Sequence, residues 1–125
     1  MNGNIVLDTN ILIYLSKKQL DLKVLFQENT RYSISVITKI ELLGYHFKEE
    51  EELRIINGII NALNVIPLTD EIVKLTIALR KKHKIKIPDA IVYASAQSLR
   101  GSLYTNNLAD FAKINESVKL YNPMA

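Results

Sequence analysis

Four acidic residues lie where an apolar run meets the start of a probable helix, in the segments IVLDTN, TKIELLGY, IPDAIVYASA and TNNLADF. They are Asp8, Glu41, Asp89 and Asp110. Carboxylates brought to one point repel each other unless a cation lies among them. Because a ligand set made only of oxygen atoms suits a hard ion, these residues predict a site for Mg²⁺ or Mn²⁺.

Each acid also has a simpler structural explanation, because acidic side chains are common at helix starts. Asp8 can be an N-cap, and Thr38 with Glu41 fits the capping box S/T-x-x-E. Asp89 and Asp110 can simply favour the positive end of their helices. Glu41 is late for a cap, since it follows about a turn and a half of helical sequence. The metal-site interpretation therefore depends on the four acids taken together.

The elements that must position these acids follow a βα pattern, in which short apolar runs alternate with segments of helical period. Strands are predicted at residues 4–7, 32–35, 65–66, 103–105 and, at an edge, 118–121. Helices are predicted at residues 11–15, 20–27, 36–47, 49–63, 69–82, 89–99 and 108–113, with Pro88 at the first position of the sixth. This order predicts an α/β fold with a parallel sheet of four or five strands between two layers of helices.

The carboxyl ends of parallel strands share one edge of the sheet, which is the usual ligand crevice of such folds. Asp8 and residues 105–110 follow predicted strands directly, so they should meet at this edge. Asp89 has no predicted strand before it and has to reach the site from the start of its helix.

Composition narrows the classes of function. A chain of 125 residues suits one domain, here 1–125. The absence of cysteine excludes disulfides, zinc–thiolate sites and thiol nucleophiles, and it fits a cytoplasmic protein. The apolar run at the N-terminus is far too short to span a membrane. His46 and His83 stand in no triad-like context, and the four glycines form no phosphate-binding loop.

The motifs resemble those of a known family. The segments LDTNILIYL, S-x-x-x-x-x-E with a glycine three residues on, PDAIVYASA and TNNLADF, in this order, resemble the PIN domain and particularly the VapC-type toxins of toxin–antitoxin pairs. The resemblance implies an α/β/α sandwich, Mg²⁺- or Mn²⁺-dependent endoribonuclease activity, an antitoxin partner and a homodimer.

Matched by motif, Asp8, Glu41 and Asp89 correspond to the most dependable acids of the family, and Asp110 corresponds to the acid of the last block. Many relatives place an acid directly after T-x, where this chain has Asn107, so Asp110 must supply a fourth carboxylate or the site has only three.

In phosphodiester hydrolysis, metal ions lower the pKa of an attacking water and stabilise charge on the phosphoryl and leaving oxygens. We expect Asp8 and Asp89 to be direct ligands, Glu41 to be a ligand or a water-positioning base, and Asp110 to bind an outer metal position. Nearby side chains that can orient carboxylates or water, although they are also ordinary turn and cap residues, are Thr9, Asn10, Thr105 and Asn107.

RNA contacts are predicted in the segment RKKHKIK, which either guides phosphates or forms a solvated helix end. Its cations are Arg80, Lys81, Lys82, Lys84 and Lys86. The formal net charge of +3 alone does not imply a nucleic-acid partner. Tyr14, Tyr45 and Tyr93 are candidates for stacking on unpaired bases, although tyrosines at helical spacing more often pack in cores.

Two further functions stay open at this stage. A PIN nuclease can process RNA or cleave DNA without an antitoxin, and a catalytically silent PIN fold can serve as an RNA-binding or dimerisation module. The intact Asp8, Glu41 and Asp89 argue against the silent module.

Overall fold

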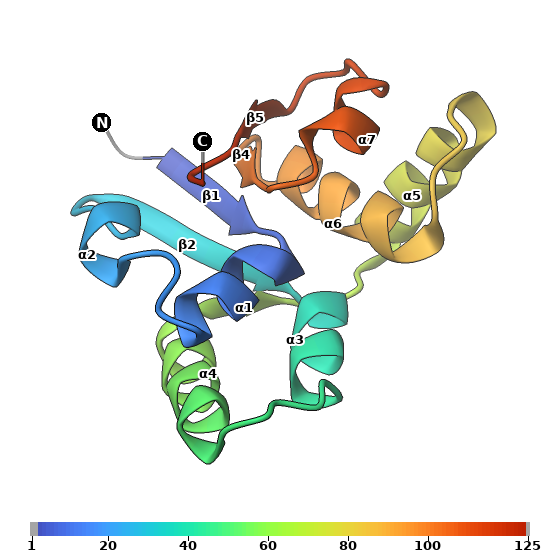
Figure 1. The fold of residues 1–125 in the computed structure, drawn as a ribbon. Coiled ribbons are helices and arrows are strands. Elements are labelled where there is room, and N and C mark those ends of the chain that lie inside the picture. Colours follow the sequence, from blue (N-terminus) through green and yellow to red (C-terminus); the bar gives the residue numbers. More distant parts are fainter. Residues whose placement is uncertain (1–2, 125) are drawn as a thin grey trace.

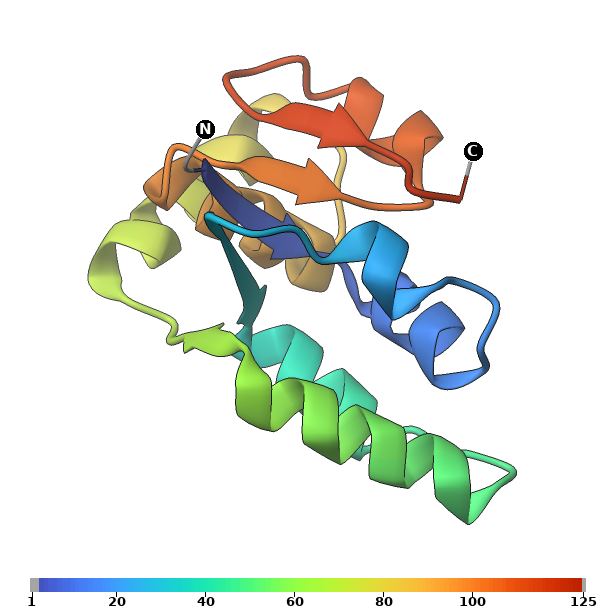
Figure 2. The ribbon, with the colours of Figure 1, turned by 90° about the vertical axis from the view of Figure 1, so that its left-hand side faces the viewer.

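A parallel sheet of five strands in the order β3-β2-β1-β4-β5 forms the centre of the molecule (Figures 1 and 2). The computed structural model describes residues 3–124. The strands are β1 (Gly3–Leu7), β2 (Thr30–Ser35), β3 (Asn64–Ile66), β4 (Ser102–Tyr104) and β5 (Lys119–Tyr121). Strand β1 lies in the middle, with Ile5 paired to Tyr32 of β2 and Leu7 paired to Tyr104 of β4.

Helices cover both faces of the sheet (Figure 1), as an all-parallel sheet requires. They are α1 (Thr9–Ser16), α2 (Leu22–Leu25), α3 (Val36–Leu43), α4 (Glu50–Ala62), α5 (Asp70–Lys82), α6 (Ile87–Ser98) and α7 (Leu108–Ala112). Because successive side chains of a strand point to opposite faces, Val6 packs with α5, α6 and α7, whereas Leu7 packs with α1 and α4. The predicted α/β/α class is confirmed. Within residues 3–124, no helix has the length and apolar character needed to cross a membrane.

Helix α6 is buried most deeply, since every side chain from Ala90 to Ala96 is buried. It packs between the sheet and α5, as Figure 1 shows. The helix begins at Ile87, two residues before the predicted start, and Pro88 is its second residue rather than its first. Proline is tolerated there because the first backbone N–H groups of a helix have no acceptor within it.

Two predicted helices are shorter in the structure. The helix predicted at residues 20–27 spans only Leu22–Leu25, because the Tyr32 hydroxyl, from the following strand, donates to Leu25 O at 2.8 Å and accepts from Gln27 N at 2.9 Å. The helix predicted at residues 36–47 ends at Leu43, where Gly44 forms the C-cap and its N–H bonds to Ile40 O. The remaining boundaries differ from the prediction by one or two residues.

The turn between α6 and β4 lies directly against β1. Arg100 has a left-handed backbone with φ 52°, and a side chain at Gly101 would collide with the backbone carbonyl of Asn4. Glycine at this position therefore lets β4 lie directly beside β1. As a result, the residues that follow the two strands meet at one edge of the sheet.

Candidate active site

Asp8 is the first residue after β1 and the N-cap of α1. One carboxylate oxygen accepts a hydrogen bond from Thr9 N at 2.9 Å, and the other accepts from Thr105 Oγ1 at 2.8 Å. The side chain is held by two neighbouring segments of the sheet edge, and Asp8 is only 7% exposed. The predicted N-cap role of Asp8 is therefore confirmed. Asp8 is also a buried carboxylate whose orientation is fixed by two hydrogen bonds.

Burial raises the pKa of Asp8 above its ordinary value of 3.8, and the negative charge of Glu41 raises it further. The hydrogen bonds from Thr105 and Thr9 oppose this effect without cancelling it. A buried carboxylate beside a second acid is stabilised in its ionised form when a cation binds nearby.

Glu41 reaches the same place from α3. Its Oε1 accepts a hydrogen bond from Thr9 Oγ1 at 2.7 Å, and Thr9 Oγ1 lies 3.2 Å from the buried Thr38 Oγ1. Thr9 thus contacts both acids, with its N–H on Asp8 and its hydroxyl on Glu41. The alternative of a capping box at Thr38 and Glu41 is wrong, because Ser35 caps α3 by accepting from Ile37 N.

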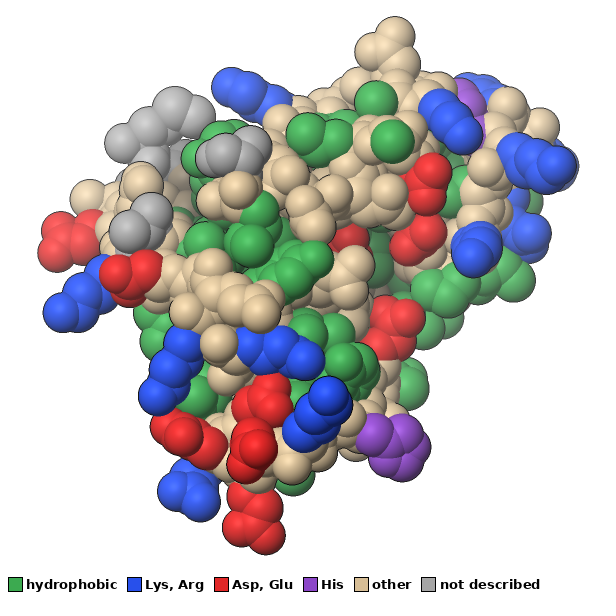
Figure 3. Space-filling model, viewed as in Figure 1, with side chains coloured by type: hydrophobic (Ala, Val, Ile, Leu, Met, Phe, Trp, Pro, Cys, Tyr) green, Lys and Arg blue, Asp and Glu red, His purple; other side chains and the backbone are tan. Residues whose placement is uncertain are grey.

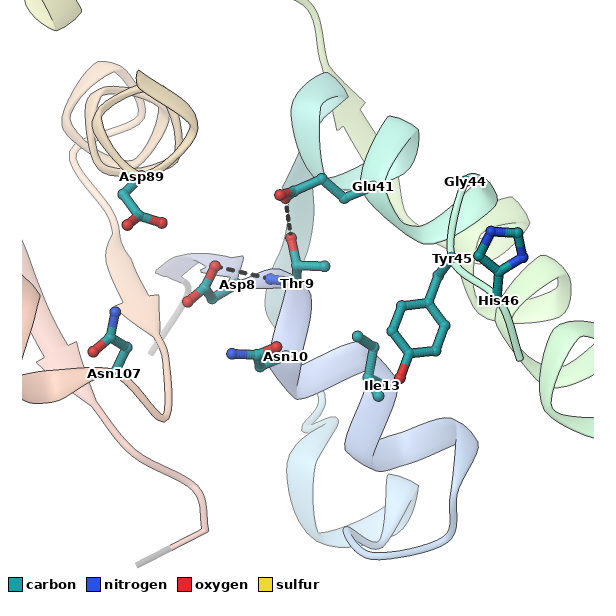
Figure 4. A pocket seen from close by; sticks show the side chains of 10 residues that line it. All are labelled: Asp8, Thr9, Asn10, Ile13, Glu41, Gly44, Tyr45, His46, Asp89 and Asn107. Carbon is teal, nitrogen blue, oxygen red and sulfur yellow. Dashed lines mark hydrogen bonds between the residues drawn. The ribbon is translucent and has the colours of Figure 1, made fainter. Parts of the chain in front are cut away.

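Asp89 lies in the first turn of α6, and its half-buried side chain points toward Asp8 in Figure 4. Burial raises its pKa above 3.8, and the charges of Asp8, Glu41 and Asp110 raise it further. The cation of Lys86 acts in the opposite direction. Acids that are distant in sequence are therefore close enough to repel each other.

Asp110 and Asn107 occupy the outer side of this group. Asn107 Nδ2 donates to Asp110 Oδ2 at 3.1 Å, while Asn107 N donates to Thr105 Oγ1 at 2.9 Å. Asn107 lines the cleft formed by the acids, whereas Asp110 is exposed and is not among the lining residues. The charge of Asp110 still contributes to the raised pKa of Asp89.

The acids open onto a cleft of about 640 Å³. Figure 3 shows acidic side chains around a hollow between α3 and α6, and Figure 4 shows the side chains that line it. The lining residues are Asp8, Thr9, Asn10, Ile13, Glu41, Gly44, Tyr45, His46, Asp89 and Asn107. Ile13, Gly44 and His46 were not predicted to line the site, and Thr38, which lies behind Thr9, was predicted only as a possible cap.

The donor set fits a hard divalent cation in its chemistry, because it offers carboxylate oxygens in an open, polar cleft. Among residues 3–124, no three Asp, Glu or His side chains lie close enough together to form a complete metal-binding group. This spacing is compatible with Mg²⁺, which keeps several of its waters and commonly binds one or two carboxylates together with substrate phosphates.

The predicted RNA-binding cations are all exposed, at the end of α5 and in the loop before α6. Of these, Lys86 is near enough to Asp89 to affect its pKa. Arg80 Nε donates to Ile85 O at 3.2 Å, which ties the end of α5 to that loop.

The predicted stacking tyrosines differ in their surroundings. Tyr93 is 1% exposed and packs against Phe111, so it belongs to the core and the stacking role predicted for it is wrong. Tyr14 accepts a hydrogen bond from Asn106 Nδ2 at 2.9 Å. Tyr45 lines the cleft.

Solved structures share the whole fold. A chain of VapBC from Salmonella typhimurium, solved bound to DNA, has a TM-score of 0.83 and 26% identity, covering 98% of this chain and 99% of that one. A toxin–antitoxin complex from Klebsiella pneumoniae contains a chain with 33% identity and a TM-score of 0.73, covering 95% and 97%. VapBC-1 from nontypeable Haemophilus influenzae gives 26% identity and a TM-score of 0.77, covering 98% and 99%. Among curated proteins, no significant match was found.

The family model of the PIN domain matches residues 5–116, a range that includes Asp8, Glu41, Asp89 and Asp110. Together with the solved structures, this match confirms the resemblance to VapC-type toxins seen in the sequence. The chain therefore belongs to the PIN domain family.

Proposed function

We propose that this PIN domain is a Mg²⁺- or Mn²⁺-dependent endoribonuclease that acts as the toxin of a type II toxin–antitoxin pair. The observation that carries the proposal is the convergence of Asp8, Glu41 and Asp89, from three separate segments, on one open cleft. Their mutual repulsion supports a cation as the missing partner, because the pKa of Asp89 is raised by the charges of both other acids.

The bound metal supplies an attacking water of lowered pKa and stabilises charge on the phosphoryl and leaving oxygens. Asp8 and Asp89 are the residues that would hold it, since they line the cleft from the end of β1 and from the start of α6. Glu41 is fixed through one oxygen by Thr9 and orients water or metal with the other. Asp110, held by Asn107, serves the outer side of the site.

Charge and the known relatives support the proposed partners. The exposed cations from Arg80 to Lys86 lead toward Asp89 along the loop before α6, which suits an RNA backbone. An antitoxin is supported by the toxin–antitoxin complexes in which similar chains were solved. A homodimer is supported by exposed apolar side chains, among them Ile40 of α3 and Ile77 of α5, which are 62% and 51% exposed.

The experiment that tests the activity compares Asp89→Asn with Asp70→Asn, a matched loss of one carboxylate in the first turn of α5 and outside the cleft. Purified proteins are incubated with a mixture of single-stranded RNAs in Mg²⁺, in Mn²⁺ and in EDTA. We expect the wild type and Asp70→Asn to cleave RNA only with metal, and Asp89→Asn to be inactive and to melt in EDTA at the wild-type temperature or above it. Full activity of Asp89→Asn would refute the proposed site.

A further inference from the structure

The cleft has a second wall of different chemistry from the acidic one. It is formed by Ile13 of α1 and by Gly44, Tyr45 and His46 after α3. This wall has no formal charge at neutral pH when His46 is neutral, whereas the opposite side carries Asp8, Glu41 and Asp89. A ligand that fills the cleft must therefore have one end that is cationic or is held through a bound metal ion, and another end that is neutral, flat or apolar.

Tyr45 is the main surface of this wall. It is 41% exposed, and its ring is supported from behind by Phe47, with ring centroids 4.6 Å apart and planes at 53°. Figure 4 shows the ring next to the side chain of Ile13, with the imidazole of His46 beside it. Gly44, which ends α3 just before this ring, lines the cleft as well.

The separation of the two walls fits one nucleotide. Ile13 follows Thr9 by four residues on α1, a rise of about 6 Å along the helix. Asn10 and Ile13 lie on the same side of α1 because they are three residues apart, so this helix forms a continuous floor from the acids to the tyrosine. The distance is comparable to that between a phosphate and its own base.

We infer that Tyr45, with Ile13 and His46, forms a subsite for an unpaired nucleobase adjacent to the cleaved phosphate. This inference rests on the proposed ribonuclease function and adds the residue that holds the substrate's base. A base stacks on the exposed tyrosine ring, which tolerates any base because each has a flat aromatic face. The His46 ring nitrogens lie at the side of the ring, where they can contact the polar edge of the base. The subsite selects RNA whose bases are unpaired at the cleavage point.

The test measures kcat/KM on short single-stranded RNAs that carry either the natural base or an abasic residue, placed on each side of the cleaved bond in turn. The variants are Tyr45→Ala and Tyr45→Phe. The matched control is Tyr121→Ala, which removes a 53% exposed tyrosine on β5 that is not a lining residue of the cleft. Thermal melts establish that each variant is folded.

We expect Tyr45→Ala to lower kcat/KM about tenfold on RNA with the natural base, and to have no effect on the RNA that is abasic at the stacked position. Tyr45→Phe should keep the wild-type value, as should Tyr121→Ala. An equal loss on natural and abasic RNA, or no loss on either, would overturn the subsite. Unchanged cleavage together with weaker inhibition by an antitoxin would also overturn it, in favour of a protein contact. No cleavage by the wild type would instead overturn the proposed function, and the subsite with it.

Discussion

Replacing Asp8 in the metal-free protein separates the effect of its charge from the effect of its hydrogen bonds. Asp8→Asn removes the charge but keeps an oxygen that can accept from Thr9 N, since asparagine is as good an N-cap as aspartate. The amide of this variant can also donate to Thr105 Oγ1, which in the wild type donates to Asp8. Asp8→Ala removes the charge and both hydrogen bonds.

The structure gives the size of the difference. Loss of the cap lowers the free energy of unfolding by about 1 kcal/mol. Loss of the hydrogen bond to Thr105 Oγ1, which the amide of Asp8→Asn keeps with the donor and acceptor exchanged, lowers it by about 0.5–1.5 kcal/mol more. Both variants gain equally from removal of a buried charge that Glu41 repels. Asp8→Ala should therefore be about 1.5–2.5 kcal/mol less stable than Asp8→Asn, while Asp8→Asn should lie within about 1 kcal/mol of the wild type or above it.

Urea denaturation in EDTA measures these differences, and thermal melts check them. For a domain of this size about 4 °C corresponds to 1 kcal/mol, so the two variants should melt about 6–10 °C apart. Magnesium at about 100 times its Kd should stabilise the wild type by about 2.7 kcal/mol and should stabilise neither variant. If Asp8→Asn in EDTA were as unstable as Asp8→Ala, the charge itself would be stabilising and the argument from repulsion would be wrong.

Three more predictions follow from the same contacts. Thr105→Val should lower the free energy of unfolding by about 1–3 kcal/mol and should also weaken Mg²⁺ binding, because Asp8 loses a hydrogen-bond donor and Asn107 N loses an acceptor. Thr105→Ser should restore both quantities. Urea denaturation measures the first and calorimetric titration with Mg²⁺ the second. Asn107→Asp should tighten Mg²⁺ binding by adding a carboxylate that lines the cleft. Asp110→Asn should reduce RNA cleavage less than Asp89→Asn, because Asp110 does not line the cleft. Equal losses of cleavage rate in Asp110→Asn and Asp89→Asn would contradict this order. In EDTA, the pKa values of Asp8 and Asp89 are higher in the folded chain than in the unfolded chain. Above pH 3.8 the folded chain therefore holds more protons than the unfolded chain, and the contribution of these two acids to the free energy of unfolding falls as the pH rises. Urea denaturation at about pH 5 and about pH 7 should show the wild type gaining on Asp8→Asn at the lower pH.

The sequence was sufficient for the fold where local pattern and tertiary packing agree. The apolar runs before Asp8 and Thr105 became neighbouring strands, and the glycine at position 101 is explained by the contact between them. The short second helix was overestimated because the group that ends it, the Tyr32 hydroxyl, belongs to the next strand. Such a contact leaves no mark in the periodicity of residues 20–27.

The acids of the site were predictable because each follows a strand or begins a helix whose end lies at one edge of the sheet. The hydrogen bonds that hold each acid in place were not predictable from the sequence. Thr9 contacts Glu41 across 32 positions, and only the packing of α1 beside α3 brings them together. Of the second wall of the cleft, Tyr45 was predicted as a stacking residue, whereas Ile13 and His46 were missed for the same reason. The one local signal was Gly44, three residues after Glu41, which ends α3 and turns Tyr45 toward the site.

The hydrogen bond from Thr105 to Asp8 joins positions 97 apart. Strand β1 pairs on one side with β2, which is synthesised much earlier than Thr105, and on the other side with β4, which ends one residue before Thr105. A growing polypeptide leaves the ribosome from its N-terminus, so Asp8 emerges long before the residue that fixes it. The cleft is completed only after residues up to Asn107 have emerged and β4 has paired with β1. Under the proposed function, the nascent chain cannot cleave the RNA around it before β4 has paired with β1.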